Sequence, residues 1–293
     1  MAKVSHQLEY AATICGVKLA QALSPKMADK LGAGLGSLAH TVLTSRRRIA
    51  NENLRRAFGN ELSDEQRAVV VKNVFRNAGR TMIEFARFGV LRQDGLRAIV
   101  EGPGLPELEE ARSRGNGAII VSAHFGNWEM MGAWIATQGF PMDFLIGTQH
   151  NLKVDQLLVE FREAMGVGII RLSTSARSVF KTLKANRITG LVSDQHASSG
   201  GVTLPFFGRP AATPKGPALF AIRAKSMLLP CVLRRERHDH HVVMKGPAIY
   251  PPNSGNEEED IRQMTAAYTK FFEDAIRQYP DQWLWTHRRW KLD

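Results

Sequence analysis

The sequence predicts an α/β fold: a largely parallel or mixed central sheet flanked by helices and preceded by an N-terminal helical region. Two observations predict it. The early part of the chain has the periodicity of helices alone, whereas short apolar runs alternate with amphipathic helices after Gly102-Pro103-Gly104. Such alternation is typical of parallel strands joined by crossover helices. We therefore expect a helical region over residues 1–95 and an α/β domain over residues 96–293.

Two apolar segments open the helical region. Leu8–Ser24 carries Glu9 and Lys18, and Leu31–Thr44 is shorter than the roughly 20 apolar residues that a membrane-spanning helix needs. Both segments fit helices that lie in a membrane interface, and the following Arg46-Arg47-Arg48 would favour anionic lipid. We expect a membrane-docking region; the alternative is a pair of packed helices with a solvated basic corner.

Further helices complete this region. Arg47–Phe58 is amphipathic, and Ser63 with Gln66 forms a capping box that opens a long helix ending near Phe88. In the α/β part, apolar runs predict strands at Gly117–Ser122, Phe144–Gly147, Gly168–Leu172, Ile188–Val192, Met227–Leu233 and His241–Lys245. The helical patterns between and after them cover Asn127–Gln138, Val154–Met165, Ala176–Lys184, Pro214–Lys225 and Glu257–Tyr279.

Composition restricts the function only loosely. The net charge of +11 and a pI near 9.9 favour anionic partners such as phospholipid, nucleic acid or an acidic carrier protein. Two cysteines without a CxxC pattern indicate a reducing compartment. No GxxxxGK[ST], GxSxG or HExxH motif is present, so we expect no metal and no cofactor. The tract His238–His241 fits a solvated hairpin turn better than a metal site.

The most informative stretch is His124-Phe-Gly-Asn-Trp-Glu129, directly after a predicted buried strand. Glu129 falls in the first turn of the next helix, where a carboxylate is electrostatically favoured. A carboxylate bonded to one imidazole nitrogen would fix the tautomer of His124 and make the other nitrogen more basic. The pair could then take a proton from an alcohol, so that the alcohol attacks a thioester directly. The spacing alone also fits a structural histidine beside an unrelated glutamate.

Several separated blocks extend this motif into a family pattern. HFGNWE resembles the His-x4-Asp/Glu motif of the glycerolipid acyltransferase superfamily. The chain is similar, more specifically, to the bacterial lipid A late acyltransferases, which transfer lauroyl or myristoyl groups. The supporting blocks are Asn53–Phe58 (NLRRAF), Asn77–Arg80 (NAGR) with Glu84, Ser193–Gln195 (SDQ), Leu204–Thr213 (LPFFGRPAAT) and Pro280–Lys291 (PDQWLWTHRRWK).

This resemblance implies an enzyme in which His124 is the catalytic base and Glu129 its partner. It implies transfer from acyl carrier protein to a hydroxyl of a bacterial glycolipid, a lipid A precursor, on the cytoplasmic face of the inner membrane at an anionic phospholipid surface. The implied substrate-binding residues are Asn127, Asp194, Gln195, Arg209, Thr213 and Lys215. For Arg209 and Lys215 the alternative is plain surface charge, and for Asp194 a strand-end cap. For the tail Trp285–Trp290 we favour packing over catalysis.

One departure from the family leaves the acceptor open. Lipid A enzymes typically carry an arginine, often within Tyr-Arg-Pro, where this chain has Ile146–Asn151. The charge could come from Lys153, Arg171 or Arg209, or the acceptor could be a lysophospholipid, a glycolipid mannoside or an amino-acid lipid. A basic nucleic-acid-binding protein is the non-enzyme alternative, but basic and aromatic residues are interleaved only near Trp283–Trp290. We therefore expect no nucleic-acid partner.

Overall fold

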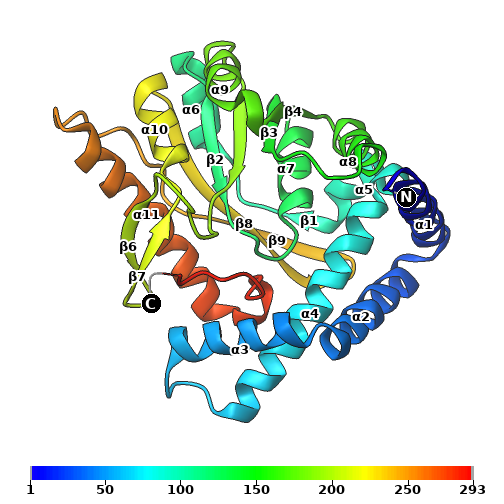
Figure 1. Ribbon diagram of the computed structural model, residues 1–293. Coiled ribbons are helices and arrows are strands. Elements are labelled where there is room, and N and C mark those ends of the chain that lie inside the picture. Colours follow the sequence, from blue (N-terminus) through cyan, green and yellow to red (C-terminus); the bar gives the residue numbers. More distant parts are fainter. Residues whose placement is uncertain (1, 292–293) are drawn as a thin grey trace.

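A seven-stranded sheet forms the centre of the computed structural model, which describes residues 2–291 and the side chains of residues 5–173 and 176–291 (Figure 1). The strand order is β1-β9-β8-β2-β5-β3-β4, and every neighbouring pair is parallel except β8 with β9. These strands are β1 (Val100–Glu101), β2 (Ala118–Ser122), β3 (Met142–Ile146), β4 (Val167–Arg171), β5 (Ile188–Val192), β8 (Met227–Arg237) and β9 (His240–Lys245). The predicted α/β class with a mostly parallel sheet is confirmed.

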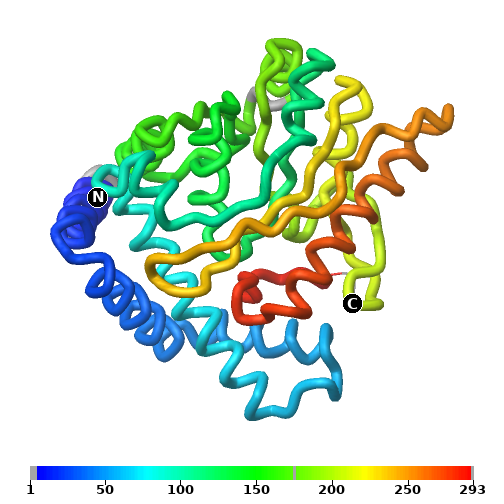
Figure 2. The backbone as a smooth tube through the Cα atoms, turned by 180° about the vertical axis from the view of Figure 1, so that it is seen from behind, coloured from blue at the N-terminus to red at the C-terminus, as the bar shows by residue number. Residues whose placement is uncertain are grey.

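Helices precede the sheet and cover both of its faces (Figures 1 and 2). The first group is α1 (Ala2–Ala22), α2 (Pro25–Val42), α3 (Thr44–Phe58), α4 (Asp64–Ala86) and α5 (Phe88–Ile99). The second group is α6 (Pro106–Arg114), α7 (Trp128–Thr137), α8 (Leu152–Ala164), α9 (Ser175–Lys184), α10 (Gly216–Ala224) and α11 (Glu257–Gln278). An N-terminal helical region is therefore confirmed, whereas the division of the chain at residue 95 stays a prediction.

Alternate residues of β2 divide the core into two clusters. Ile119 and Val121 point to one face, where α3, α4, α9, α10 and α11 contribute side chains. Ala118 and Ile120 point to the other face, where α5, α6, α7 and α8 pack. Because successive side chains of a strand alternate between faces, a strand buried on both sides reads as a continuous apolar run. That is the pattern from which β2 was predicted.

Close helix packing joins α2 to α4. A Cβ on Gly36 would lie 2.2 Å from the Phe75 carbonyl oxygen, and one on Gly79 would lie 2.2 Å from the Gly32 carbonyl oxygen. Only glycine allows two backbones to approach so closely. The predicted capping box at Ser63 and Gln66 is present at the start of α4. None of the described helices combines the length and the apolar character needed to cross a membrane.

The sequence missed the antiparallel hairpin of β6 (Val202–Phe206) and β7 (Arg209–Thr213). Its facing prolines, Pro205 and Pro210, argue against a strand in a sheet interior, but a separate two-stranded sheet tolerates them. The helix predicted from Pro214 begins at Gly216 instead, with Pro217 in its first turn. In the part of the chain that the structure describes, the short elements β1 and α6 and the helix α5 were also not predicted.

The expectation of a solvated turn at residues 238–241 is partly wrong. The turn between β8 and β9 does lie there, but His241 is completely buried within β9. Its Nε2 lies 3.4 Å from Oε1 of Glu84. Glu84 in turn binds Arg235 through two hydrogen bonds of 2.6 and 2.8 Å. His241 therefore belongs to a buried polar network rather than to a hairpin surface.

Candidate active site

The candidate site lies where β2 and β5 end side by side. Ser122 and Val192 are paired in register at the carboxyl ends of these parallel strands. His124 and Asp194 each follow two residues later, so the register brings them together. In α/β folds this edge of the sheet is where ligands bind.

His124 is bound twice by Asp194. The imidazole Nδ1 lies 2.7 Å from Asp194 Oδ1, and the backbone N–H of His124 donates a 2.9 Å hydrogen bond to Oδ2. Since a carboxylate only accepts, Nδ1 carries the proton. The other ring nitrogen, Nε2, is then unprotonated and can act as a base. The side chain of Asp194 is almost fully buried, while that of His124 is about one quarter exposed.

Glu129 does not have the predicted position. We expected it to bind the imidazole of His124, but both of its oxygens accept hydrogen bonds from Arg162, at 2.6 and 2.8 Å. The reason is the direction of α7, which begins at Trp128 and places Glu129 against α8, the helix that carries Arg162. Asp194, expected to bind substrate, is the carboxylate bonded to His124. Glu129 acts on His124 only through its charge.

Charge balance at the site favours a basic histidine. Burial lowers the pKa of His124, but the negative charge and hydrogen bond of Asp194, with a smaller contribution from Glu129, outweigh it and raise that pKa above its ordinary value. Burial raises the pKa of Asp194, but His124 outweighs that effect and holds it well below its usual range. Asp194 is therefore ionised near neutral pH, and His124 accepts a proton more readily than a free imidazole.

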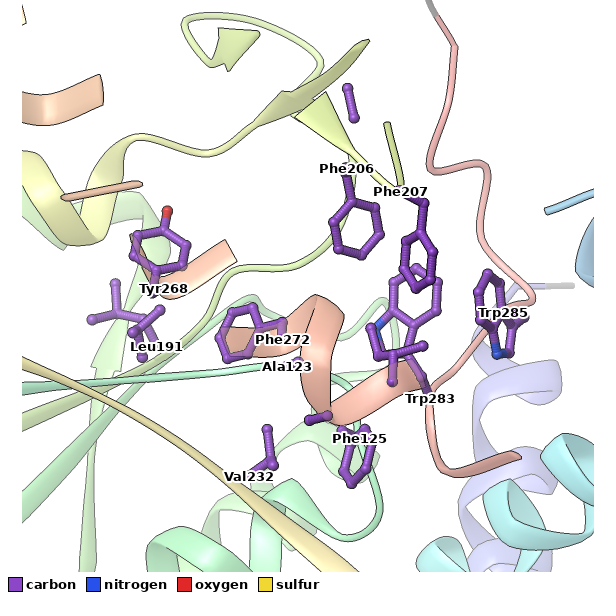
Figure 3. Packing of buried hydrophobic residues seen from close by; sticks show 14 of the residues in the cluster. Ala123, Phe125, Leu191, Phe206, Phe207, Val232, Tyr268, Phe272, Trp283 and Trp285 are labelled. Carbon is purple, nitrogen blue, oxygen red and sulfur yellow. The ribbon is translucent and has the colours of Figure 1, made fainter. Parts of the chain in front are cut away.

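The C-terminal tail fixes this geometry. Trp283 donates a 2.7 Å hydrogen bond from its indole Nε1 to Asp194 Oδ2, and Leu284 N–H donates to the carbonyl oxygen of His124 at 2.9 Å. Figure 3 shows Trp283 between Phe125 and the aromatic rings of the β6–β7 hairpin. The predicted packing role of the tail agrees with the burial of Trp283, Trp285 and Trp290.

Gly126 explains the glycine of the HFGNWE motif. Its φ is +54°, and a Cβ would lie 1.7 Å from the carbonyl oxygen of Leu233 on β8. Its own carbonyl oxygen accepts a hydrogen bond from Thr81 of α4 at 2.8 Å. Any other residue would push the loop that carries His124 away from β8.

A cleft of about 580 Å³ opens beside His124. Its lining is mainly apolar, and its polar groups include the two carboxylates of Glu129 and Asp155. Asp155 is paired with Arg171 at 2.5 and 3.1 Å, so Arg171 binds a carboxylate of the cleft lining. Pro214, Gly216 and Pro217, at and just before the start of α10, also line the cleft. The apolar lining further includes Trp128, Phe144, Leu145, Ile146, Leu158, Leu172, Leu191, Val192 and Phe220.

Two predicted binding residues lie at the site but in supporting positions. Asn127 is completely buried as the N-cap of α7, where its Oδ1 accepts from Met130 N–H and its Nδ2 donates to Glu84. It does not line the cleft. Gln195 places its amide nitrogen 3.4 Å from His124 Nδ1 but does not line the cleft, whereas its neighbour Ser193 does.

Three other predicted binding residues do not reach the cleft. Arg209 lies on β7 and donates to the carbonyl oxygen of Arg56 at 2.9 Å, which ties the hairpin to α3. Thr213 is buried and accepts a 2.7 Å hydrogen bond from Arg289. Lys215 is exposed beside the lining residue Gly216, but its own side chain does not line the cleft. Arg209 and Thr213 lie within the hairpin that the sequence did not predict, and Lys215 directly follows it.

The sequence contained a signal for the Asp194 contact. Two adjacent parallel strands end at the same edge of a sheet, and polar residues follow both predicted strands, at His124 and at Ser193-Asp194-Gln195. No comparable signal existed for Arg162, which lies in the last turn of an amphipathic helix, or for the indole of Trp283. Their positions depend on the packing of distant segments.

Metal binding has little support at this site. Within the described residues, the one group of three potential ligands close enough to share an ion is His6, Glu9 and His150, where α1 meets the segment before α8. None of these three lines the cleft.

Comparison with known proteins agrees with the family resemblance. The model of the family described as bacterial lipid A biosynthesis acyltransferase matches residues 2–292. The match runs across the candidate cleft, the N-terminal helices and the tail that binds Asp194. The predicted resemblance is thereby confirmed.

Individual relatives of known name share between a quarter and a third of their aligned residues with this chain. The chain is 28% identical over 201 residues to a phosphatidylinositol mannoside acyltransferase of Mycobacterium tuberculosis (strain H37Rv), covering 65% of this chain and 60% of that protein. It is 26% identical over 267 residues to the lipid A biosynthesis lauroyltransferase of Escherichia coli K12, covering 89% and 84%. The chain thus spans about three fifths of the mycobacterial relative and most of the Escherichia coli one.

Proposed function

Because the chain belongs to the bacterial lipid A biosynthesis acyltransferase family, we propose that it transfers a fatty acyl group from an acyl thioester to a hydroxyl of a bacterial glycolipid. The observation that carries this proposal is the His124–Asp194 pair at the mouth of a largely apolar cleft. A base next to an apolar cleft suits a reaction that joins a polar hydroxyl to an aliphatic chain.

The reaction needs no nucleophile from the protein. His124 Nε2 takes the proton of the acceptor hydroxyl as its oxygen attacks the thioester carbonyl carbon. The tetrahedral intermediate then collapses, the C–S bond breaks, and the leaving sulfur takes the proton back from His124. Asp194 stabilises the imidazolium between these two steps and keeps Nδ1 as the protonated nitrogen.

The donor in this proposal is acyl carrier protein. Such carriers are acidic, and this chain has a net charge of +11. The acceptor is a phosphorylated glycolipid, with a lipid A precursor as the first candidate. The mycobacterial relatives are named for phosphatidylinositol mannoside, which makes a glycolipid mannoside the second candidate.

The proposed location is the cytoplasmic face of the bacterial inner membrane. Apolar side chains on one side of α2 and on α4 lie open to solvent: Leu35, Leu38, Val42, Leu43 and Met82 are between 47% and 64% exposed. Arg46 and Arg48 are exposed directly after them. Exposed apolar residues beside cations are what an anionic lipid surface binds.

Turnover of purified protein with an acyl-carrier thioester and each of the two glycolipids would test the proposal. We expect His124→Ala to abolish acyl transfer to the preferred acceptor without changing the circular dichroism spectrum. The matched control is His238→Ala, which removes a histidine at the β8–β9 turn and should keep full activity. A fully active His124→Ala enzyme, or no transfer to any lipid hydroxyl by the unaltered protein, would refute the proposal.

A further inference from the structure

A second cavity, of about 400 Å³, lies beside the His124–Asp194 pair. Ser193 lines the apolar cleft, whereas Gln195 and His196 line the second cavity. Only Asp194 separates these lining residues along the chain, and His124 itself lines the apolar cleft but not the second cavity. The remaining lining residues come from the start of α3 (Ser45, Arg46 and Ile49) and from the tail (His287, Arg288 and Lys291).

The second cavity is strongly cationic. Arg46, Arg288 and Lys291 are exposed along it, and no carboxylate lines it within the described part of the chain. Among the described residues, Arg46 makes one hydrogen bond, to the carbonyl oxygen of Thr286 at 3.2 Å, which leaves most of its five N–H donors for a ligand. Two guanidinium groups and an ammonium around one cavity fit a phosphate.

His287 adds a hydrogen-bond acceptor to this cavity. Its Nδ1 lies 2.8 Å from the carbonyl oxygen of Leu284, and because a carbonyl only accepts, Nδ1 carries the proton. Burial lowers the pKa of His287 to about 4, so the ring is neutral at pH 7. Its Nε2 is buried without a partner among the described residues. Buried polar atoms normally form hydrogen bonds, so we expect this nitrogen to accept one from a donor such as a ligand hydroxyl.

An apolar groove adjoins the cationic cavity and shares Arg46 with it. The groove has a volume of about 440 Å³ and lies between α2, α4 and the tail. Leu35, Leu43 and Met82 line it and are 47%, 47% and 64% exposed. A ligand that fills both spaces would have an anionic, hydroxylated head and an apolar body.

From this arrangement we propose that the cavity formed by Arg46, His287, Arg288 and Lys291 binds the phosphate and a neighbouring hydroxyl of a phosphorylated lipid headgroup. The proposal rests on the proposed function, because it identifies this headgroup as part of the acceptor. The phosphate lies among the three cations, the hydroxyl donates to His287 Nε2, and the lipid tails lie along the groove of Leu35, Leu43 and Met82.

Binding can be tested without turnover, on the full chain, by phosphorus-31 NMR titration. Glucose 1-phosphate carries both features of the proposed headgroup, and inorganic phosphate carries one. We expect the double variant Arg288→Glu/Lys291→Glu to weaken the binding of both probes by at least about tenfold, since hydrogen bonds to charged groups contribute roughly 1.5–3 kcal/mol. The matched control is Lys184→Glu, a charge reversal at an exposed position of α9 that does not line the cavity. It should bind both probes as the unaltered protein does.

A second variant tests the hydroxyl contact. His287→Phe keeps a ring against Trp283, whose ring centroid lies 5.0 Å from that of His287, but removes the acceptor nitrogen. It should weaken the binding of glucose 1-phosphate and leave that of inorganic phosphate unchanged. If glucose 1-phosphate does not bind the unaltered protein, or binds the double variant equally well, the proposed site is wrong whether or not the protein transfers acyl groups.

Kinetics then distinguish the two possible sources of the phosphate. For a headgroup phosphate, Arg288→Glu/Lys291→Glu raises the KM for the acceptor, leaves the KM for the acyl thioester donor unchanged, and has little effect on an acceptor without its phosphate. A rise confined to the donor KM would assign the cavity to the phosphodiester of a carrier's prosthetic arm and overturn the headgroup assignment. If the unaltered protein binds glucose 1-phosphate but transfers no acyl group, only the proposed function is refuted.

Discussion

The indole N–H of Trp283 and the imidazole of His124 bind the same carboxylate, that of Asp194, at 2.7 Å each. The indole hydrogen bond satisfies Oδ2, while Oδ1 remains for the imidazole. A buried carboxylate with both oxygens paired keeps a fixed orientation. Asp194, rather than Glu129, is therefore the residue that positions His124.

Replacement of Asp194 by Asn should lower kcat by about 10²–10⁴-fold, the usual size of a general-base contribution. The amide keeps the shape of the side chain but loses its negative charge, so it neither fixes the tautomer of His124 nor stabilises the imidazolium. Single-turnover acyl transfer measures the effect. A loss of less than about threefold would show that Asp194 only caps the strand end.

The pH dependence of kcat/KM should reflect the raised pKa of His124. The base works only when neutral, so activity should fall as pH decreases, with a midpoint above the ordinary histidine value of 6.5. In Asp194→Asn the midpoint should move to lower pH, because the charge that raises the pKa is gone. The His124–Asp194 pair also stabilises the fold below pH 6.5, and this contribution is lost as pH rises through the raised pKa. A midpoint that does not move would contradict the assignment.

The variant Trp283→Phe should reduce activity by about tenfold, since a neutral donor to a buried charge contributes roughly 1.5–3 kcal/mol. Phe keeps the aromatic packing against Phe206 but leaves Asp194 Oδ2 with one donor fewer. The comparison variant is Trp285→Phe, whose indole donates only to the carbonyl oxygen of Pro280. If both variants lose the same activity at the same stability, the indole–carboxylate bond has no specific role.

Glu129→Gln should lower the free energy of unfolding by about 3 kcal/mol, because it leaves Arg162 unpaired in a nearly buried position. Arg162→Met should cost a similar amount. The double variant should be less destabilised than the sum of the two, since the unpaired charge is gone. Urea denaturation measures all three. Strict additivity would mean that the two side chains do not form the ion pair in solution.

Gly36→Ala should destabilise the N-terminal helices by about 1–3 kcal/mol, because the added methyl collides with the α4 backbone. The matched control is Gly34→Ala, two residues away in the same helix, where a Cβ has open space. That change should be neutral or stabilising by up to about 1 kcal/mol, because alanine favours helix. Equal effects in thermal denaturation would contradict the close contact of α2 with α4.

Local signals predicted much of the fold. The buried runs gave the six longer strands of the main sheet, and the Ser63 capping box located the start of α4, because both depend on short-range patterns. The β6–β7 hairpin was missed because Pro205 and Pro210 hide the strand pattern. At the site, sequence identified His124 and Glu129 but paired them wrongly. Spacing along the chain does not show that α7 turns Glu129 toward Arg162, or that two strand ends meet at Asp194.

The tail of the chain has a consequence for the timing of activity during synthesis. During synthesis the chain emerges from its N-terminal side. Here the strands that carry His124 and Asp194 precede the segment that supplies Trp283 and the N–H of Leu284. A nascent chain could complete the sheet and still hold an unsupported Asp194. Asp194 then gains its indole donor in one step, when Trp283 docks against the completed sheet.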